Sequence, residues 1–597
     1  MTVERAGLAP DWVARKLVTC DEVRFAAGAL WWLQSDPDHG GSRRIMRAGL
    51  GGTARAVTPP ELSVGGQLHA YGGGDFAAAA DGVWFVGGDG SLFHHAAVGG
   101  APVRIAAGGE QVQYGDLSLT SDGVLLAVRG HDSMDEIVSV SPSGETSVMV
   151  RSSGFLASPR LEQGMLAYLE WDRDQMPWDG SRLRLAPAGS GTIGPGAVVA
   201  GGPQESVVQP SWGPDGHLYF MSDRTGWWNL YRLHSGSEVE AVAPIDADCT
   251  PAPWEGGYQS YGFATHGEVV LTITDGITSE LLSVDGAGGQ RRLAPNLTSV
   301  KPYVAVADGS VIVIGSTPSS PASIWSAELA VGSTGSAQRV GPEPAPSPSW
   351  TVSPPSVETV GSAGGPLRLL LHQPAGAGQV PLIVRAHPGP TDGVPLRLDW
   401  TTQFFVSHGF TVAEVLYRGS TGQGRAFRQS LHGHWGEYDV DDCATVAEQL
   451  LASGLATPGA VFISGASAGG YTALQAACRP APFAGATAVS AIIDPVRWEK
   501  SVPAFQRPHA AVLSGPTGAV LPGNIRRPVL MIHGTRDTIT SSDDARKFAD
   551  ELAARGDDHD SLFLEGGDHY LSDPASRERA LRAELDFYQR VIRHGTA

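Results

Sequence analysis

Residues 461–470 read Val461-Phe462-Ile463-Ser464-Gly465-Ala466-Ser467-Ala468-Gly469-Gly470, and they decide the fold of the C-terminal half. The apolar run predicts a strand and residues 471–477 predict a helix, so Ser467 lies in the tight turn between them. Gly465 and Gly469 leave room for neighbouring backbone. The pattern G-x-S-x-G also arises by chance in Gly-rich chains. In this strand-turn-helix setting it predicts a nucleophilic serine, with the Ala468 amide facing a developing oxyanion.

An acid and a histidine follow in the order that such a serine requires. Asp537 comes after an apolar strand at 529–534, and His569 comes after the last strand. In a triad, His569 takes the proton from Ser467 and Asp537 orients the imidazole. Asp568 is the rival acid, but its place beside His569 gives it poor reach to the ring. A lone Asp or His in a loop is usually just solvated. Three residues in order, each after its own strand, favour the triad.

A second oxyanion donor should come from the loop after an early strand of the sheet. The segment His387-Pro388-Gly389-Pro390 follows the apolar run at 382–386 and fits that place. The alternative is an ordinary Pro/Gly turn. The sequence therefore assigns the oxyanion site to Ala468 and the His387 loop.

Residues 356–597 alternate apolar strands with helices, which predicts a mostly parallel sheet covered by helices on both faces. Together with the serine turn, this pattern predicts an α/β-hydrolase catalytic domain. Residues 341–355 are rich in Pro and Ser and are predicted to be a linker.

Residues 1–340 predict an all-β domain of a different kind. Short strands are separated by turn residues, including Asp81-Gly82, Asp122-Gly123 and Asp215-Gly216. Similar units recur about every 40 to 50 residues, as in the four-stranded blades of a propeller. We predict a seven-bladed β-propeller, with a β-sandwich array as the competing arrangement. About 20 residues at the start could instead pack on the hydrolase.

Composition excludes several classes of partner. The chain has 597 residues and a formal net charge of -20, so nucleic acid and membrane surfaces are disfavoured as partners. The start of the sequence lacks a signal-peptide pattern, and the four cysteines are scattered. We therefore expect a cytoplasmic protein. His94-His95 and His432-Gly433-His434 lack a matching acidic or cysteine cluster, so we expect no metal. No organic cofactor is expected either.

Longer motifs resemble the prolyl oligopeptidase family of serine peptidases, closest to its dipeptidyl-aminopeptidase and acylaminoacyl-peptidase-like bacterial branch. The resemblance covers nearly the whole chain. Its motifs are His387-Pro388-Gly389-Pro390-Thr391, residues 417–424 (YRGSTGQG) and 435–442 (WGEYDVDD), and in the other half 71–74 (YGGG), 170–172 (EWD) and 222–231 (SDRTGWWNLY). The resemblance implies that a seven-bladed propeller caps the hydrolase and that the site lies in the cavity between them. It also implies the same triad and oxyanion site, with short peptides or small amides as substrates.

The chain departs from the family pattern at three places. Pro388 replaces a glycine and removes a backbone donor. The sequence His69-Ala70-Tyr71 lacks an acidic residue that relatives carry. Residues 494–521, which help to form the P1 pocket in relatives, look short and divergent. Trp498 and Phe505 either line that pocket or are core aromatics. The family's specificity is therefore not carried over.

The leading hypothesis is amide hydrolysis of short peptides or aminoacyl amides, in the manner of an aminopeptidase or dipeptidyl peptidase. A substrate with a free amine calls for a carboxylate, and Glu170, Asp172 and Asp174, close to Trp178, are the candidates. Their alternative is an ordinary role as solvated hairpin charges. A dedicated amidase or esterase for an aminoacyl metabolite or antibiotic, and an acylaminoacyl peptidase or oligopeptidase, remain open. A propeller binding module with an inactive hydrolase is disfavoured by the intact triad. The oligomeric state is open, a homo-oligomer included.

Overall fold

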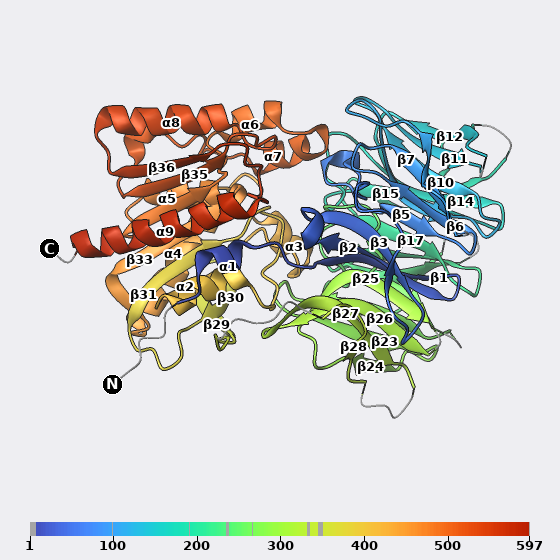
Figure 1. Ribbon diagram of the computed structural model, residues 1–597, viewed down its shortest axis with the longest axis horizontal. Helices are drawn as coiled ribbons and strands as arrows, with labels where there is room; N and C mark the ends of the chain where they lie inside the picture. Colours follow the sequence, from blue (N-terminus) through green and yellow to red (C-terminus); the bar gives the residue numbers. More distant parts are fainter. Residues whose placement is uncertain are drawn as a thin grey trace.

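Two domains lie side by side in the computed structural model (Figure 1). It describes residues 7–595, except 98, 142, 190–191, 235–237, 265–266, 308, 331–334 and 344–349. The central part of the predicted linker at 341–355 therefore lies outside the described residues. Within the described part of the chain, no helix is both long and apolar enough to cross a membrane.

The N-terminal domain is the predicted seven-bladed propeller. Its described residues form seven four-stranded sheets, each a meander of strands that are consecutive in sequence. The strands are, blade by blade, β1 (Cys20–Ala26), β2 (Ala29–Asp36), β3 (Ser42–Ala48), β4 (Arg55–Ala56); β5 (Phe76–Ala78), β6 (Gly82–Val86), β7 (Leu92–Ala96), β8 (Val103–Ala106); β9 (Gln113–Leu119), β10 (Leu125–Gly130), β11 (Asp135–Val140), β12 (Thr146–Ser152); β13 (Phe155–Glu162), β14 (Met165–Trp171), β15 (Ser181–Pro187), β16 (Ala197–Gly202); β17 (Val207–Trp212), β18 (Leu218–Ser222), β19 (Asn229–Leu233), β20 (Val239–Ala241); β21 (Tyr261–Phe263), β22 (Val269–Thr274), β23 (Ser279–Val284), β24 (Gln290–Leu293); β25 (Ser299–Ala307), β26 (Ser310–Thr317), β27 (Ser320–Glu328) and β28 (Gln338–Arg339).

The turn glycines explain part of this regularity. Gly123 and Gly216 adopt positive φ angles of 83° and 80°, as their Asp-Gly turns predict. The expectation is wrong at Asp81-Gly82, because Gly82 is the first residue of β6 and lacks a positive φ. The first and last blades meet through side chains: Trp32 packs in one apolar cluster with Ile312 of β26.

The C-terminal domain is the predicted α/β-hydrolase. Its eight-stranded sheet has the order β29-β30-β32-β31-β33-β34-β35-β36, and the pairs from β32–β31 to β35–β36 are parallel. The strands are β29 (Ser356–Ser362), β30 (Gly365–His372), β31 (Val380–Ala386), β32 (Thr411–Leu416), β33 (Ala456–Ala466), β34 (Gly485–Val489), β35 (Val529–Gly534) and β36 (His559–Leu564). The helices are α1 (Pro10–Ala14), α2 (Trp400–Ser407), α3 (Gly424–Gln429), α4 (Tyr438–Ala452), α5 (Ala468–Ala477), α6 (Pro495–Ser501), α7 (Arg507–Leu513), α8 (Ser542–Arg555) and α9 (Pro574–Gly595).

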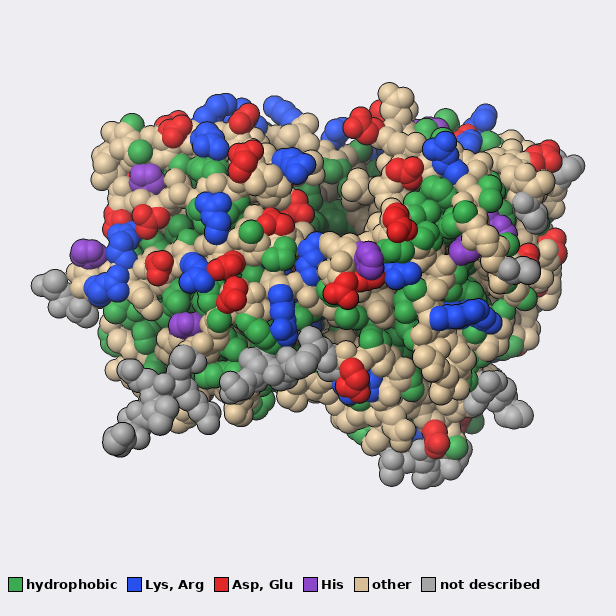
Figure 2. All heavy atoms as spheres, viewed as in Figure 1, with side chains coloured by type: hydrophobic (Ala, Val, Ile, Leu, Met, Phe, Trp, Pro, Cys, Tyr) green, Lys and Arg blue, Asp and Glu red, His purple; other side chains and the backbone are tan. Residues whose placement is uncertain are grey.

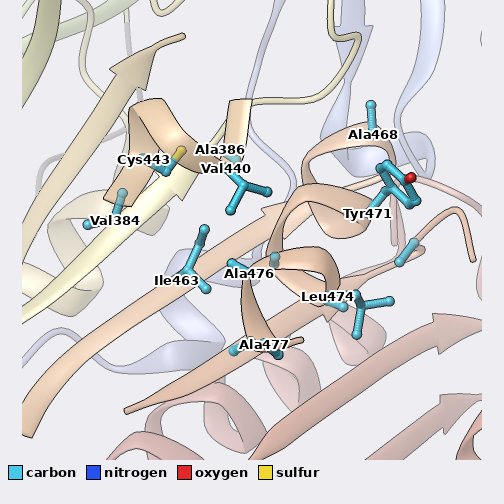
Figure 3. Packing of buried hydrophobic residues seen from close by; sticks show 14 of the residues in the cluster. Val384, Ala386, Val440, Cys443, Ile463, Ala468, Tyr471, Leu474, Ala476 and Ala477 are labelled. Carbon is cyan, nitrogen blue, oxygen red and sulfur yellow. The ribbon is translucent and has the colours of Figure 1, made fainter. Parts of the chain in front are cut away.

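Helices cover both faces of this sheet, as its strand-helix alternation predicts. On one face α4, α5 and α8 bury apolar side chains, and Figure 3 shows Ile463 of β33 close to Ala476 of α5. On the other face lie α1, α2 and α9. Helix α1 belongs to the start of the chain yet packs here, with Trp12 edge-on to Trp400 at 4.7 Å. The sheet thus holds the turn between β33 and α5 in a rigid frame.

Candidate active site

Ser467 lies between β33 and α5 in a backbone conformation that few side chains adopt. Its φ is 54° and its ψ is −114°. A Cβ atom on Gly465 would lie 2.2 Å from the carbonyl oxygen of Gly469, and one on Gly469 would lie 2.1 Å from the carbonyl oxygen of Ala386. Only glycine fits at both positions, so the turn that projects the serine depends on them.

Asp537 and His569 form a hydrogen-bonded pair. The Nδ1 atom of His569 lies 2.8 Å from Oδ2 of Asp537. Oδ1 of the same carboxylate accepts the amides of Ile539 and Thr540, each at 2.8 Å. Burial alone would raise the pKa of Asp537, but hydrogen bonds from His533 and His569 hold that pKa well below its usual range. Asp537 is therefore ionised at neutral pH and holds the proton of His569 on Nδ1, which leaves Nε2 free to act as a base.

The rival acid, Asp568, contacts the backbone of a nearby residue. Its Oδ1 accepts the amide of Ser572 at 2.8 Å, and the residue is exposed. The Ser467 hydroxyl makes no hydrogen bond within the described part of the chain. Catalytic hydrogen bonds are commonly long before substrate binds, so this geometry is compatible with a serine-histidine pair.

The predicted oxyanion site contains one helix amide and one loop. Ala468 is the first residue of α5, where main-chain amides lack partners within the helix. The His387 ring stacks on Tyr417 at 4.1 Å, and its Nδ1 and Nε2 lie 2.8 Å from the Pro388 carbonyl and 2.7 Å from the Ser420 hydroxyl. Burial lowers the pKa of His387 to about 4, so the ring is neutral. With both nitrogens engaged, this loop can offer an oxyanion only a main-chain amide.

The two aromatic candidates of the hydrolase lie in different places. The Nε1 atom of Trp498 donates to the carbonyl of Ile539 at 2.9 Å, so Trp498 supports the loop that carries Asp537. Phe505 is buried against the propeller, with its ring 5.8 Å from that of His69 and 5.8 Å from that of Phe155. Trp178 is also buried at this interface, 4.6 Å from the ring of Trp254.

The acidic candidates of the propeller are mostly paired with arginines. Glu170 forms an ion pair with Arg184, and Asp172 forms one with Arg182 at 2.6 Å. Asp174 lines a cavity of about 540 Å³ at the domain boundary, together with residues of α3 and α7. Glu170 and Asp172 therefore already have cationic partners within the propeller.

A second interdomain cavity was missed by the sequence interpretation. It has a volume of about 430 Å³ and includes Glu255 of the propeller and Asp392 of the hydrolase in its lining. On the face drawn in Figure 2 the surface is also hollowed where the two domains meet. The sequence signal was the segment Trp254-Glu255-Gly256-Gly257, in which an aromatic and an acid precede two glycines. Nothing local links that segment to Asp392.

Comparison with known proteins agrees with this geometry. Residues 396–595 match the prolyl oligopeptidase family. The matched segment is about a third of the chain. The chain is 35% identical over 136 residues to the acylamino-acid-releasing enzyme of Sus scrofa, a stretch that covers 22% of this chain and 19% of that protein. It is 33% identical over 95 residues to dipeptidyl aminopeptidase BIII of Pseudoxanthomonas mexicana, covering 16% and 14%.

One solved structure is similar to this chain across both domains. The solved structure of a puromycin-hydrolysing peptidase of Mycobacterium tuberculosis superposes with a TM-score of 0.91 at 26% identity, covering 98% of this chain and 96% of that one. The two curated relatives, in contrast, are matched over less than a fifth of their own length. The family resemblance and the propeller-plus-hydrolase architecture expected from the sequence are confirmed.

Proposed function

We propose that this protein is a serine hydrolase that cleaves amide bonds of short peptides or aminoacyl amides through Ser467, His569 and Asp537. The observation that carries the proposal is the Asp537–His569 pair, in the loops that follow β35 and β36, beside the strained turn of Ser467. An ionised, fully hydrogen-bonded aspartate next to a histidine is the arrangement that makes a serine nucleophilic.

The chemistry follows from these groups. His569 Nε2 takes the proton of the Ser467 hydroxyl as its oxygen attacks the substrate carbonyl. The Ala468 amide donates to the resulting oxyanion, and a main-chain amide of the His387 loop is the second proposed donor. His569 then protonates the leaving amine, which departs and leaves an acyl-enzyme. Water, deprotonated by the same histidine, releases the acyl group and restores Ser467.

The position of the propeller supports small substrates. The Ser467 turn packs on the His387 loop, because a Cβ atom on Gly469 would lie 2.9 Å from the carbonyl oxygen of His387. Pro388 of that loop lines the cavity of about 430 Å³ between the domains. The two cavities at the domain boundary have volumes of about 430 and 540 Å³, a size that suits short peptides and small amides. We propose aminopeptidase-like or dipeptidyl-peptidase-like cleavage as the leading activity.

A dedicated aminoacyl amidase is the second candidate. It is favoured by the likeness across both domains to a puromycin-hydrolysing peptidase, since the similarity covers 98% of this chain. Such an enzyme would turn over one aminoacyl compound well and a peptide panel poorly.

The test is hydrolysis of chromogenic amides by the wild type and by Ser467→Ala. The panel contains free aminoacyl, dipeptidyl and N-acetyl-aminoacyl compounds with varied side chains. We expect turnover by the wild type and a loss of about 10⁴-fold or more in kcat for Ser467→Ala. Labelling by a fluorophosphonate probe should disappear in the variant. Turnover or labelling that survives Ser467→Ala would overturn the proposal.

A further inference from the structure

A pocket between the first two blades of the propeller contains three basic side chains. Its volume is about 190 Å³, and its lining includes Arg47 of β3, Arg55 of β4 and His95 of β7. Among the described residues of the lining, none is acidic. Asp81, on the adjoining turn between β5 and β6, is exposed and lies outside the lining. In a chain with a formal net charge of -20, this pocket is a local concentration of positive charge.

Strand pairing places the two arginines side by side. Arg47 is directly opposite Arg55 on one side and opposite Trp31 of β2 on the other. Residues that are opposite in neighbouring antiparallel strands point to the same face of the sheet, with Cβ atoms about 4.5–5.5 Å apart. The three side chains therefore form a row across the first blade. The guanidinium carbon of Arg47 lies 5.2 Å from the centre of the Trp31 ring.

His95 faces this row from the second blade. In the pairing of β6 with β7, His95 is opposite Val83, so the two side chains share a face of the sheet. Val83 belongs to the apolar cluster that also contains Trp31, and this cluster joins the two blades. The side chain of His95 therefore points toward the first blade. Its Nδ1 atom is buried and has no hydrogen-bond partner among the described residues.

The basic groups of this pocket lack partners of opposite charge. Within the described part of the chain, Arg47, Arg55 and His95 form no ion pair, and the Nε atom of Arg47 is buried without a hydrogen-bond partner. Like charges directly opposite each other across two strands destabilise the pairing. A buried donor without an acceptor also costs free energy. An anion bound between the two arginines would remove both costs.

We propose that this pocket binds a phosphate group, free or as a phosphate monoester, with Arg47, Arg55 and His95 as its donors. Arginine forks match the oxygens of a phosphate in a bidentate manner. His95 supplies a third donor in the tautomer that carries its proton on Nδ1. Pockets for drug-sized ligands span roughly 300–1,000 Å³, so a pocket of about 190 Å³ suits a small anion. The site belongs to the propeller and does not depend on the proposed hydrolase activity.

The first test is calorimetric titration of the full chain with inorganic phosphate, at an ionic strength held constant with chloride. Arg47→Gln and Arg55→Gln are the pocket variants. Arg151→Gln is the matched control, because Arg151 is an exposed arginine on the outer strand β12 and lies 2.7 Å from Glu136. We expect each pocket variant to bind phosphate about tenfold or more weakly than the wild type, with the control unchanged. No binding by the wild type, or equal affinity in all four proteins, would overturn the inference.

Thermal unfolding gives a second readout that does not depend on a weak variant. In chloride, Arg55→Gln should be at least as stable as the wild type, because it relieves the repulsion from Arg47. Phosphate should then raise the melting temperature of the wild type more than that of Arg55→Gln. Phosphate also stabilises proteins in general by exclusion from their surfaces, and that part of the rise is common to both. An equal rise in the two proteins would contradict the site.

Two further ligands identify the anion. Glycerol 3-phosphate that binds the wild type at least as tightly as inorganic phosphate would support a phosphate monoester as the ligand, and weaker binding would support the free ion. Acetate should bind about tenfold or more weakly than phosphate, because a carboxylate offers two oxygens to three donor groups. Acetate that binds as tightly as phosphate would refute the assignment of a phosphate group.

Discussion

The two sides of the domain interface differ in how their charged side chains are paired. On the α3 side, Oδ2 of Asp223 lies 2.7 Å from both Arg425 and Arg428, and Arg428 stacks on Trp228 at 3.9 Å. Asp223 and Arg428 are both fully buried there. On the cavity side, Glu255 lines the interface without an ion pair among the described residues.

The difference shows which side holds the domains together and which side is available to a ligand. A buried charge without a partner is costly, so charges that are permanently paired fix the local geometry. A carboxylate that lines a cavity without an ion-pair partner is available to bind a cation. We infer that the ion pairs of α3 form a fixed contact between the domains.

The largest expected effect concerns the proposed catalytic residues. Asp537→Asn should lower kcat by about 10⁴-fold, because an amide no longer holds the His569 proton on Nδ1. Steady-state kinetics on an amide substrate measures the loss. Asp568→Asn is the comparison. Its kcat should remain within a few fold of the wild-type value, because the Asp568 carboxylate accepts the amide of Ser572. The opposite ranking would make Asp568 the acid.

The next effect concerns the fixed contact. Arg428→Met leaves the buried Asp223 with a single cationic partner and should lower the free energy of unfolding by about 3 kcal/mol. Urea titration measures this change. Arg425→Met is the matched control: Arg425 bonds the same oxygen but is 16% exposed, so its loss should be smaller. Equal effects would show that burial does not set the strength of this contact.

A pH effect of intermediate size should come from His509 on α7. Its ring is fully buried, edge-on to Trp178 at 5.2 Å and Trp254 at 5.5 Å. Burial, with a smaller effect of His432, lowers the pKa of His509 to about 3.

Since this pKa is lowered, the stability that His509 contributes is present above the ordinary histidine pKa and is lost as pH falls below it. Between pH 7 and pH 5 the loss should be about 2 kcal/mol. Urea titrations at both pH values measure it, and His509→Phe should remove this part of the loss. The exposed His39→Gln should leave the loss unchanged. A pH dependence unaffected by His509→Phe would contradict this assignment.

The smallest effect concerns a single neutral hydrogen bond between the two domains. The Tyr71 hydroxyl donates to Oε1 of Gln506 across the interface at 2.9 Å. Tyr71→Phe should cost about 1 kcal/mol in the free energy of unfolding, the usual size for one neutral hydrogen bond. A loss as large as that of Arg428→Met would erase the distinction between the two sides.

Much of this architecture could be predicted because it follows from sequence patterns between neighbouring residues. The recurring turns predict seven blades, and strand-helix alternation predicts the parallel sheet. The proposed triad residues could be identified in the sequence because each follows its own strand. The arginine partners of the sequence candidates for amine binding could not be predicted. Glu170 and Asp172 lie beside aromatic residues in the sequence, but in the structure they pair with Arg184 and Arg182.

By itself, the sequence determined the serine turn, since Gly465 and Gly469 act on their immediate neighbours, and it determined the order of strands and helices, since hydrophobic periodicity is local. Only the tertiary structure decided that Asp392 meets Glu255 across one cavity and that Arg428 reaches Asp223. These pairs join residues more than a hundred positions apart. Their meeting depends on how two complete domains dock, which no local pattern encodes.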